Sequence, residues 1–220
     1  MRRPLIALLS AAALAAGLLV SAPAVQADPG PSYYLALGDS LAAGYQPTAC
    51  HTLPDGSVNC DTTEGYVNDL YGTLPGNNVT GDGSLQLKNL GCSGETTSSM
   101  INGGICDYDQ GSQLNAAVAF LAAHPGRVKY LTIDIGANDV DKCAPNGSID
   151  TACVLQGVLT IGQNLNTILS ALKKADGSAP LSIAMNYYDP FLYEWTTGLQ
   201  GQLVATASVA LLVAINKMDL

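Results

Sequence analysis

The stretch YYLALGDSLAAGY, residues 33–45, carries the apolar run YYLAL directly into the turn Gly38-Asp39-Ser40. Aromatic and aliphatic residues in such a short run favour a β-strand. A strand that ends on a tight turn can hold the hydroxyl of Ser40 clear of the backbone, although Gly-Asp-Ser also occurs in ordinary turns. The rest of the sequence has to decide between a catalytic serine and a structural turn.

Three further apolar runs have the length of strands, and small polar residues follow each of them. The runs span residues 85–90, 130–135 and 181–185, and the turns after them span 91–96, 136–139 and 186–190. Helical patterns occupy residues 113–123, 154–174 and about 202–217. Strands that alternate with helices predict an α/β fold with a parallel sheet, in which the carboxyl ends of the strands gather at one edge where ligands bind.

The residues at that edge could form an ester-hydrolysing site. Such chemistry needs a nucleophile, a base and hydrogen-bond donors aimed at the developing oxyanion. Ser40 is the candidate nucleophile, and its own N–H, the N–H of Gly94 and the side-chain amide of Asn138 are the candidate donors. Asp39 could pin the turn, because aspartate readily accepts from nearby backbone amides. Each residue alone could be part of a turn or a helix cap, and only their occurrence at successive strand ends favours catalysis.

Three blocks of the sequence, LGDSLAAGY, NLGCSGETT and IGANDV, resemble the GDSL or SGNH hydrolases in order and approximate spacing. The resemblance covers residues 33–190 and is closest to secreted, cysteine-containing actinobacterial-type esterases and lipases. It implies a three-layer α/β/α sandwich with a mainly parallel, flavodoxin-like sheet. It also implies Ser40 as nucleophile, Gly94 and Asn138 in the oxyanion hole, and lipid, small acyl or acetylated glycan esters as substrates. Neither a cofactor nor a metal is expected.

The sequence departs from this family in the catalytic base. Members of the family use a histidine in an Asp-x-x-His block near the C-terminus. The only histidines are His51 and His124, and neither lies in such a block. His124 precedes Pro125-Gly126 at a predicted helix end, where a solvated side chain is the ordinary interpretation. We therefore expect a copy that is truncated before the block, lacks the last strand and helix of the fold, and is impaired in turnover.

The N-terminus predicts export. Two arginines, an apolar run and small residues up to position 27 are typical of a signal peptide, which leaves a hydrolase domain over residues 28–220. The run is too short for a stable membrane anchor. A formal charge of −9 disfavours nucleic-acid partners. The expected protein is a secreted, extracellular monomer whose partner is a small-molecule ester.

Six cysteines in an exported chain favour disulfides over a metal site, since no Cys-x-x-Cys occurs and histidine is scarce. Their spacing suggests three local pairs. These are Cys50–Cys60, Cys92–Cys106 and Cys143–Cys153.

Other interpretations of the chain stay open. It could be a non-catalytic secreted module of the same fold that binds an acyl or glycan ligand, or a disulfide-stabilised surface protein in which the turns are merely structural. Asp134 lies inside an apolar strand, and we expect it to accept from neighbouring backbone N–H groups. The aromatic side chains after the fourth predicted strand could line an acyl pocket, but packing of the last helix on the sheet is the more common role. They are Tyr187, Tyr188, Phe191 and Trp195.

Overall fold

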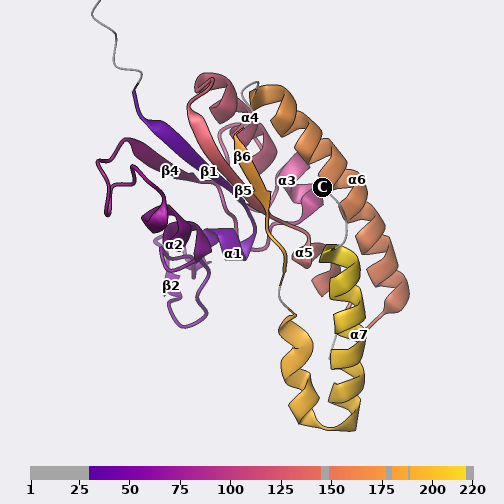
Figure 1. Ribbon diagram of the computed structural model, residues 1–220. Helices are drawn as coiled ribbons and strands as arrows, with labels where there is room; N and C mark the ends of the chain where they lie inside the picture. Colours follow the sequence, from indigo (N-terminus) through magenta and orange to yellow (C-terminus); the bar gives the residue numbers. More distant parts are fainter. Residues whose placement is uncertain (1–29, 145–148, 177–179, 188, 217–220) are drawn as a thin grey trace, which may run out of the picture.

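The computed structural model describes residues 30–144, 149–176, 180–187 and 189–216, so the predicted signal peptide lies outside the described residues. A parallel four-stranded sheet with the order β4-β1-β5-β6 forms its centre (Figure 1). Its strands are β1 (Ser32–Gly38), β4 (Leu85–Asn89), β5 (Val128–Asp134) and β6 (Leu181–Ala184). All four predicted strands are present, each within two residues of its predicted ends. Counted along the chain, the order is 2-1-3-4, which is flavodoxin-like as predicted.

Seven α-helices and one 3-10 helix accompany the sheet in the described part of the chain. They are α1 (Ser40–Ala43), α2 (Tyr66–Thr73), α3 (Thr97–Asn102), α4 (Gln113–Ala123), α5 (Ala137–Asp141), α6 (Thr151–Asp176), α7 (Leu199–Asn216) and the 3-10 helix η2 (Pro190–Thr197). The predicted helix at 113–123 is confirmed as α4, and those at 154–174 and 202–217 are confirmed as α6 and α7 with ends shifted by up to three residues.

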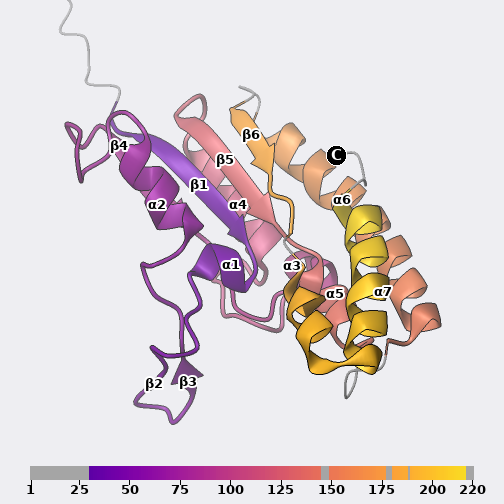
Figure 2. The same cartoon turned by 60° about the horizontal axis from the view of Figure 1, so that its bottom comes forward.

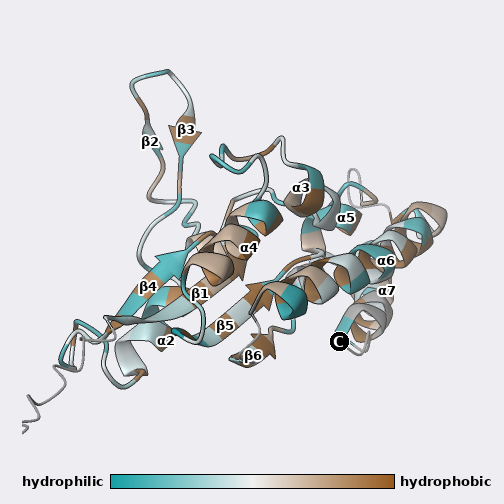
Figure 3. Ribbon diagram, turned by 90° about the horizontal axis from the view of Figure 1, so that it is seen from above, coloured by the Kyte–Doolittle hydropathy of each residue, from teal (hydrophilic) through white to brown (hydrophobic). Residues whose placement is uncertain are grey.

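The two faces of the sheet have separate cores, as the alternation of side chains along β1 requires. Leu35 and Leu37 pack with residues of α3, α4 and α6, whereas Tyr34 and Ala36 pack against α2. Figure 3 shows α2 on one side of the sheet and α4 and α6 on the other. The three-layer α/β/α prediction is therefore confirmed.

The carboxyl ends of β1 and β5 lie side by side, with Gly38 in register with Asp134. The turn after β1 leads into α1, and the turn after β5 leads into α5. Both turns therefore lie at the sheet edge where parallel α/β folds bind ligands. The turns that carry Ser40 and Asn138 are thus brought to one place.

The three predicted disulfides are confirmed, and each closes a local loop. Cys50–Cys60 lies at the hairpin formed by β2 (His51–Thr52) and β3 (Val58–Asn59), which projects from the body of the protein (Figure 2). Cys92–Cys106 spans α3, and Cys143–Cys153 joins the end of α5 to the start of α6. Disulfides of this kind fit an extracellular protein.

The last described segment forms a hairpin in which η2 packs against α7, and this hairpin lies beside α5 and α6 (Figure 2). It follows β6, which is one of the two edge strands of the described sheet and whose four residues are all exposed. No helix among the described residues has the length and apolarity needed to cross a membrane.

Candidate active site

The turn after β1 holds Ser40 at the first position of α1. The N–H of Asp39 donates to the carbonyl oxygen of Asp134 at 3.1 Å, which continues the β1–β5 pairing. The carboxylate of Asp39 accepts from the N–H of Leu41 at 3.0 Å, and Asp39 is buried. The prediction that Asp39 pins the turn through a backbone amide is confirmed by this contact.

Gln113, at the start of α4, also holds the Gly38-Asp39-Ser40 turn. The sequence analysis did not predict this role for Gln113. Its side-chain amide donates to the carbonyl oxygen of Gly38 at 2.9 Å and accepts from the Gly38 N–H at 2.8 Å. The same amide nitrogen lies 3.3 Å from a carboxyl oxygen of Glu95. Gln113 therefore ties the Gly-Asp-Ser turn to the block that contains Gly94.

The second and third sequence blocks are joined by two side chains of α5. The amide nitrogen of Asn138 donates to the carbonyl oxygen of Glu95 at 2.8 Å. Asp139 accepts from the N–H and the hydroxyl of Thr97, at 2.8 and 2.6 Å, at the start of α3. Gly94, the residue before Glu95, has a φ of +87°, which favours glycine. Asn138 is thereby held beside the Gly94 loop.

A cavity of about 270 Å³ opens beside Ser40. Ser40, Asn138, Tyr187 and Asp189 contribute polar groups to its wall, whereas Gly94 is not among the residues that line it. Apolar side chains from α1, α5, α6, η2 and α7 complete the lining. These are Leu41, Val140, Val154, Phe191 and Leu212. A small apolar cavity with a few convergent polar groups is typical of a ligand site.

The aromatic residues after β6 behave differently from one another. Tyr187 and Phe191 line the cavity, and the Tyr187 hydroxyl donates to Asp39 at 2.6 Å. These two residues therefore lie where a pocket-lining role requires, and Tyr187 is also hydrogen-bonded to Asn216 of α7. Trp195 is exposed on η2, and Tyr188 lies outside the described residues.

Asp134 lies under the turn and forms a buried carboxyl pair with Asp39. The hydroxyl of Tyr66, at the start of α2, donates to one oxygen of Asp134 at 2.5 Å, a side-chain donor that was not expected beside the backbone donors. The other oxygen is buried without a partner among the described residues. Burial, and then the nearby charge of Asp39, raises the pKa of Asp134 to about 8. Asp134 is therefore largely a neutral acid at pH 7, and both side-chain oxygens of Asp39 accept hydrogen bonds.

This raised pKa predicts a stability that falls with pH. The folded protein binds the Asp134 proton more tightly than the unfolded chain does, so the stabilisation is complete below about pH 4 and is lost as the pH rises to about 8. We expect the Tm of the unaltered protein to fall by roughly 5 °C or more over this pH range. In Asp134→Asn, whose side chain stays neutral, the fall in Tm should be smaller. Thermal unfolding followed by circular dichroism at several pH values measures it.

The comparison with Asp134→Asn is needed because burial also raises the pKa of Glu95, which contributes in the same direction. Equal slopes of Tm against pH for the two proteins would show that Asp134 is not a buried neutral acid.

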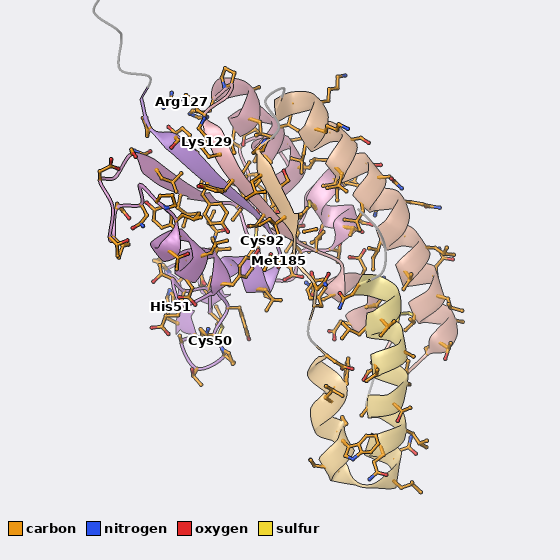
Figure 4. The ribbon with its side chains drawn as sticks, viewed as in Figure 1. Cys50, His51, Cys92, Arg127, Lys129 and Met185 are labelled. Atoms are coloured by element: carbon orange, nitrogen blue, oxygen red, sulfur yellow. A yellow bond between two sulfur atoms is a disulfide. The ribbon has the colours of Figure 1, made fainter. Side chains whose placement is uncertain are left out.

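Neither histidine lies at the cavity. His124 is half-buried, contacts the Phe120 carbonyl through Nδ1 at 2.8 Å and stacks on Tyr33 with ring centroids 4.5 Å apart, so it is not a solvated side chain. Tyr33 lies near the start of β1, and the length of the strand separates it from Ser40 by roughly 20 Å. His51 is exposed on the projecting hairpin (Figure 4).

Comparison with known proteins agrees with this geometry. Residues 36–211 match the model of the GDSL-like lipase/acylhydrolase family. A solved extracellular lipase from Streptomyces rimosus has 18% sequence identity and a TM-score of 0.55, with 85% of this chain and 74% of that chain covered. A phospholipase A1 from Streptomyces albidoflavus NA297 has 16% identity and a TM-score of 0.51, with 86% and 74% covered. At such identities these two structures support the fold alone. No curated protein sequence matches the chain.

Proposed function

Because the chain belongs to the GDSL-like lipase/acylhydrolase family and is therefore a carboxylic ester hydrolase, we propose that Ser40 is the nucleophile that attacks the ester carbonyl. The observation that carries the proposal is the position of Ser40, which lies in the wall of the cavity at the start of α1. Asn138 contributes to the same wall, and Asp39 holds the turn from below.

Three donors are proposed for the oxyanion that forms during the attack, of which Ser40 and Asn138 line the cavity, whereas Gly94 does not. These are the N–H of Ser40, the N–H of Gly94 and the side-chain amide of Asn138. The Asn138 amide has two N–H groups, and the bond to the Glu95 carbonyl oxygen uses one of them, so the other is left for a substrate. Fixed donors of this kind stabilise the tetrahedral intermediate without reorganisation.

The substrate class follows from the cavity wall. Val140, Phe191 and Leu212 would bury a short or medium acyl chain, while the reacting carbonyl lies near Ser40. We infer a small-molecule ester substrate and a monomeric enzyme. Export through a signal peptide at residues 1–27, with a mature domain over residues 28–220, remains our proposal, and the three disulfides support it.

Covalent labelling tests the nucleophile. With excess diisopropyl fluorophosphate and a long incubation, we expect a single adduct on the peptide that contains Ser40, which lines the cavity together with Asn138. Ser208 is the other serine among the described lining residues, and its hydroxyl donates to Asp189. Peptide mass spectrometry identifies the modified residue. Ser40→Ala should remain unlabelled, with Ser93→Ala as a control that keeps the label. A label on any other serine, or none at all, would contradict the assignment.

A second candidate function rests on the lining of the cavity, since the described residues that form it include no histidine. The chain could bind an acyl or glycan ligand in the cavity with little turnover. Tight binding of a non-hydrolysable amide analogue, together with no labelling of Ser40 by diisopropyl fluorophosphate, would favour this candidate.

A further inference from the structure

Tyr187 joins the last described segment of the chain to the turn that carries Ser40. Its hydroxyl donates to the second carboxylate oxygen of Asp39 at 2.6 Å, while the first oxygen accepts from the Leu41 N–H. Asp39 has 1% of its surface exposed, so water cannot replace either donor without rearrangement. Tyr187 itself contributes to the cavity wall beside Ser40.

Asn216, the last residue of α7, sets the position of Tyr187. Its side-chain oxygen accepts from the N–H of Tyr187 at 3.0 Å, and its side-chain nitrogen donates to the carbonyl oxygen of Tyr187 at 2.9 Å. Both backbone groups of one residue are thus held by one amide. The hairpin of η2 and α7 is closed further by Ser208, which donates to Asp189 at 2.9 Å.

We propose that Tyr187 is a positioning residue, held by Asn216, which through Asp39 fixes the first turn of α1 and so orients Ser40 toward the cavity. The three residues Asn216, Tyr187 and Asp39 form the tyrosine clamp. Its role in catalysis rests on the proposed function of Ser40, whereas its effect on the turn does not. Through the clamp, a shift of the η2–α7 hairpin relative to the core would change the orientation of the Ser40 side chain.

The chemistry of the contact explains why one hydroxyl matters. A hydrogen bond to a buried carboxylate is stronger than one between neutral groups, and its loss leaves an acceptor without a donor. Of the two donors to its side-chain oxygens, Asp39 then keeps only the Leu41 N–H. Helix α1 has four residues, and Asp39 is its only side-chain N-cap in the described structure. Opening of this turn should become more frequent when the phenol is removed.

Tyr66 provides a matched control for Tyr187. It also donates from a phenol to a buried carboxyl group, at 2.5 Å, but its partner is Asp134 rather than Asp39. Tyr66→Phe and Tyr187→Phe therefore remove the same atom from two similar environments. Only Tyr187→Phe removes a bond to the residue that caps the Ser40 turn.

Hydrogen exchange resolved by NMR tests the clamp. In Tyr187→Phe we expect the Leu41 amide to exchange at least about tenfold faster than in the unaltered protein, while in Tyr66→Phe it should be unchanged. Asn216→Ala should accelerate the same amide, and the double variant Tyr187→Phe/Asn216→Ala should add little to Tyr187→Phe alone, because both act through one contact. If Tyr187→Phe fails to fold, Asn216→Ala compared with Tyr66→Phe decides the question.

Unchanged exchange at Leu41 in Tyr187→Phe, or an equal increase in Tyr66→Phe, would overturn the clamp. Labelling by diisopropyl fluorophosphate adds the functional readout, with about a tenfold slower reaction at Ser40 expected in Tyr187→Phe only. If no variant is labelled, the nucleophile assignment fails, and the exchange pattern still supports or overturns the effect of Tyr187 on the turn.

Discussion

The 220-residue chain should hydrolyse p-nitrophenyl esters slowly, with a kcat on the order of 10⁴–10⁶ below that of a serine hydrolase with all its catalytic groups. As the proposed nucleophile, Ser40 would need a base to take its proton during the attack, because an unassisted hydroxyl is a weak nucleophile. His124 lies near the opposite end of β1, and His51 lies on the projecting hairpin. We therefore expect the oxyanion donors and binding to supply what rate remains.

Three other polar residues at the cavity, Asp39, Asp189 and Tyr187, are unsuited to the role of base. Both oxygens of Asp39 accept hydrogen bonds inside the protein, and those of Asp189 accept from the Phe191 N–H and the Ser208 hydroxyl. Burial, and then the charge of Asp39, raises the pKa of Tyr187, so its phenol stays protonated and cannot accept the proton.

The measurement compares residues 28–220 with Ser40→Ala on p-nitrophenyl acetate and butyrate. The expected rates are both low and differ little. His51→Ala and His124→Ala are the controls, and neither should change the residual rate. A rate well above that of Ser40→Ala, which His51→Ala then abolishes, would prove the assignment of the histidines wrong.

The regular elements of this fold could be predicted from the sequence because each has a local signal. Strand β1 is a continuous apolar run, and α6 repeats its apolar residues at helical spacing. Helix α2 was missed because Tyr66–Thr73 is short and is interrupted by Asn68, Asp69 and Gly72. The hairpin of β2 and β3 has only two residues in each strand, too few to give a periodic pattern.

The residues that support the site could not be predicted in the same way. Gln113 contacts Gly38 across 75 positions of the chain, and Tyr187 contacts Asp39 across 148. Such pairs leave no periodic trace, because they depend on how the elements pack. Asp134 did give a signal, a carboxylate inside an apolar strand, but its partner, Tyr66, belongs to a helix that the sequence did not reveal. The candidate catalytic residues could be predicted from the turns of the sequence. The contacts that hold these residues in position could be identified only from the structure.

Gly38→Ala should destabilise the protein by at least about 4 kcal/mol, which is comparable with the whole stability of many domains. Gly38 has a φ of +144°, a conformation that residues with a Cβ rarely adopt. A Cβ at this position would lie 2.3 Å from a carboxyl oxygen of Asp134 and 2.4 Å from its carbonyl oxygen. That carbonyl oxygen accepts from the Asp39 N–H, so it cannot move without breaking the pairing that sets the turn.

Urea unfolding followed by circular dichroism measures this effect, and Gly72→Ala is the matched control. Gly72 lies within α2, and a Cβ there would meet nothing within 4 Å, so alanine should stabilise the protein by about 0.5–1 kcal/mol. A Gly38→Ala protein with an unchanged urea midpoint would show that the turn tolerates a side chain. The close approach of Gly38 to Asp134 would then not be what holds Ser40 in place.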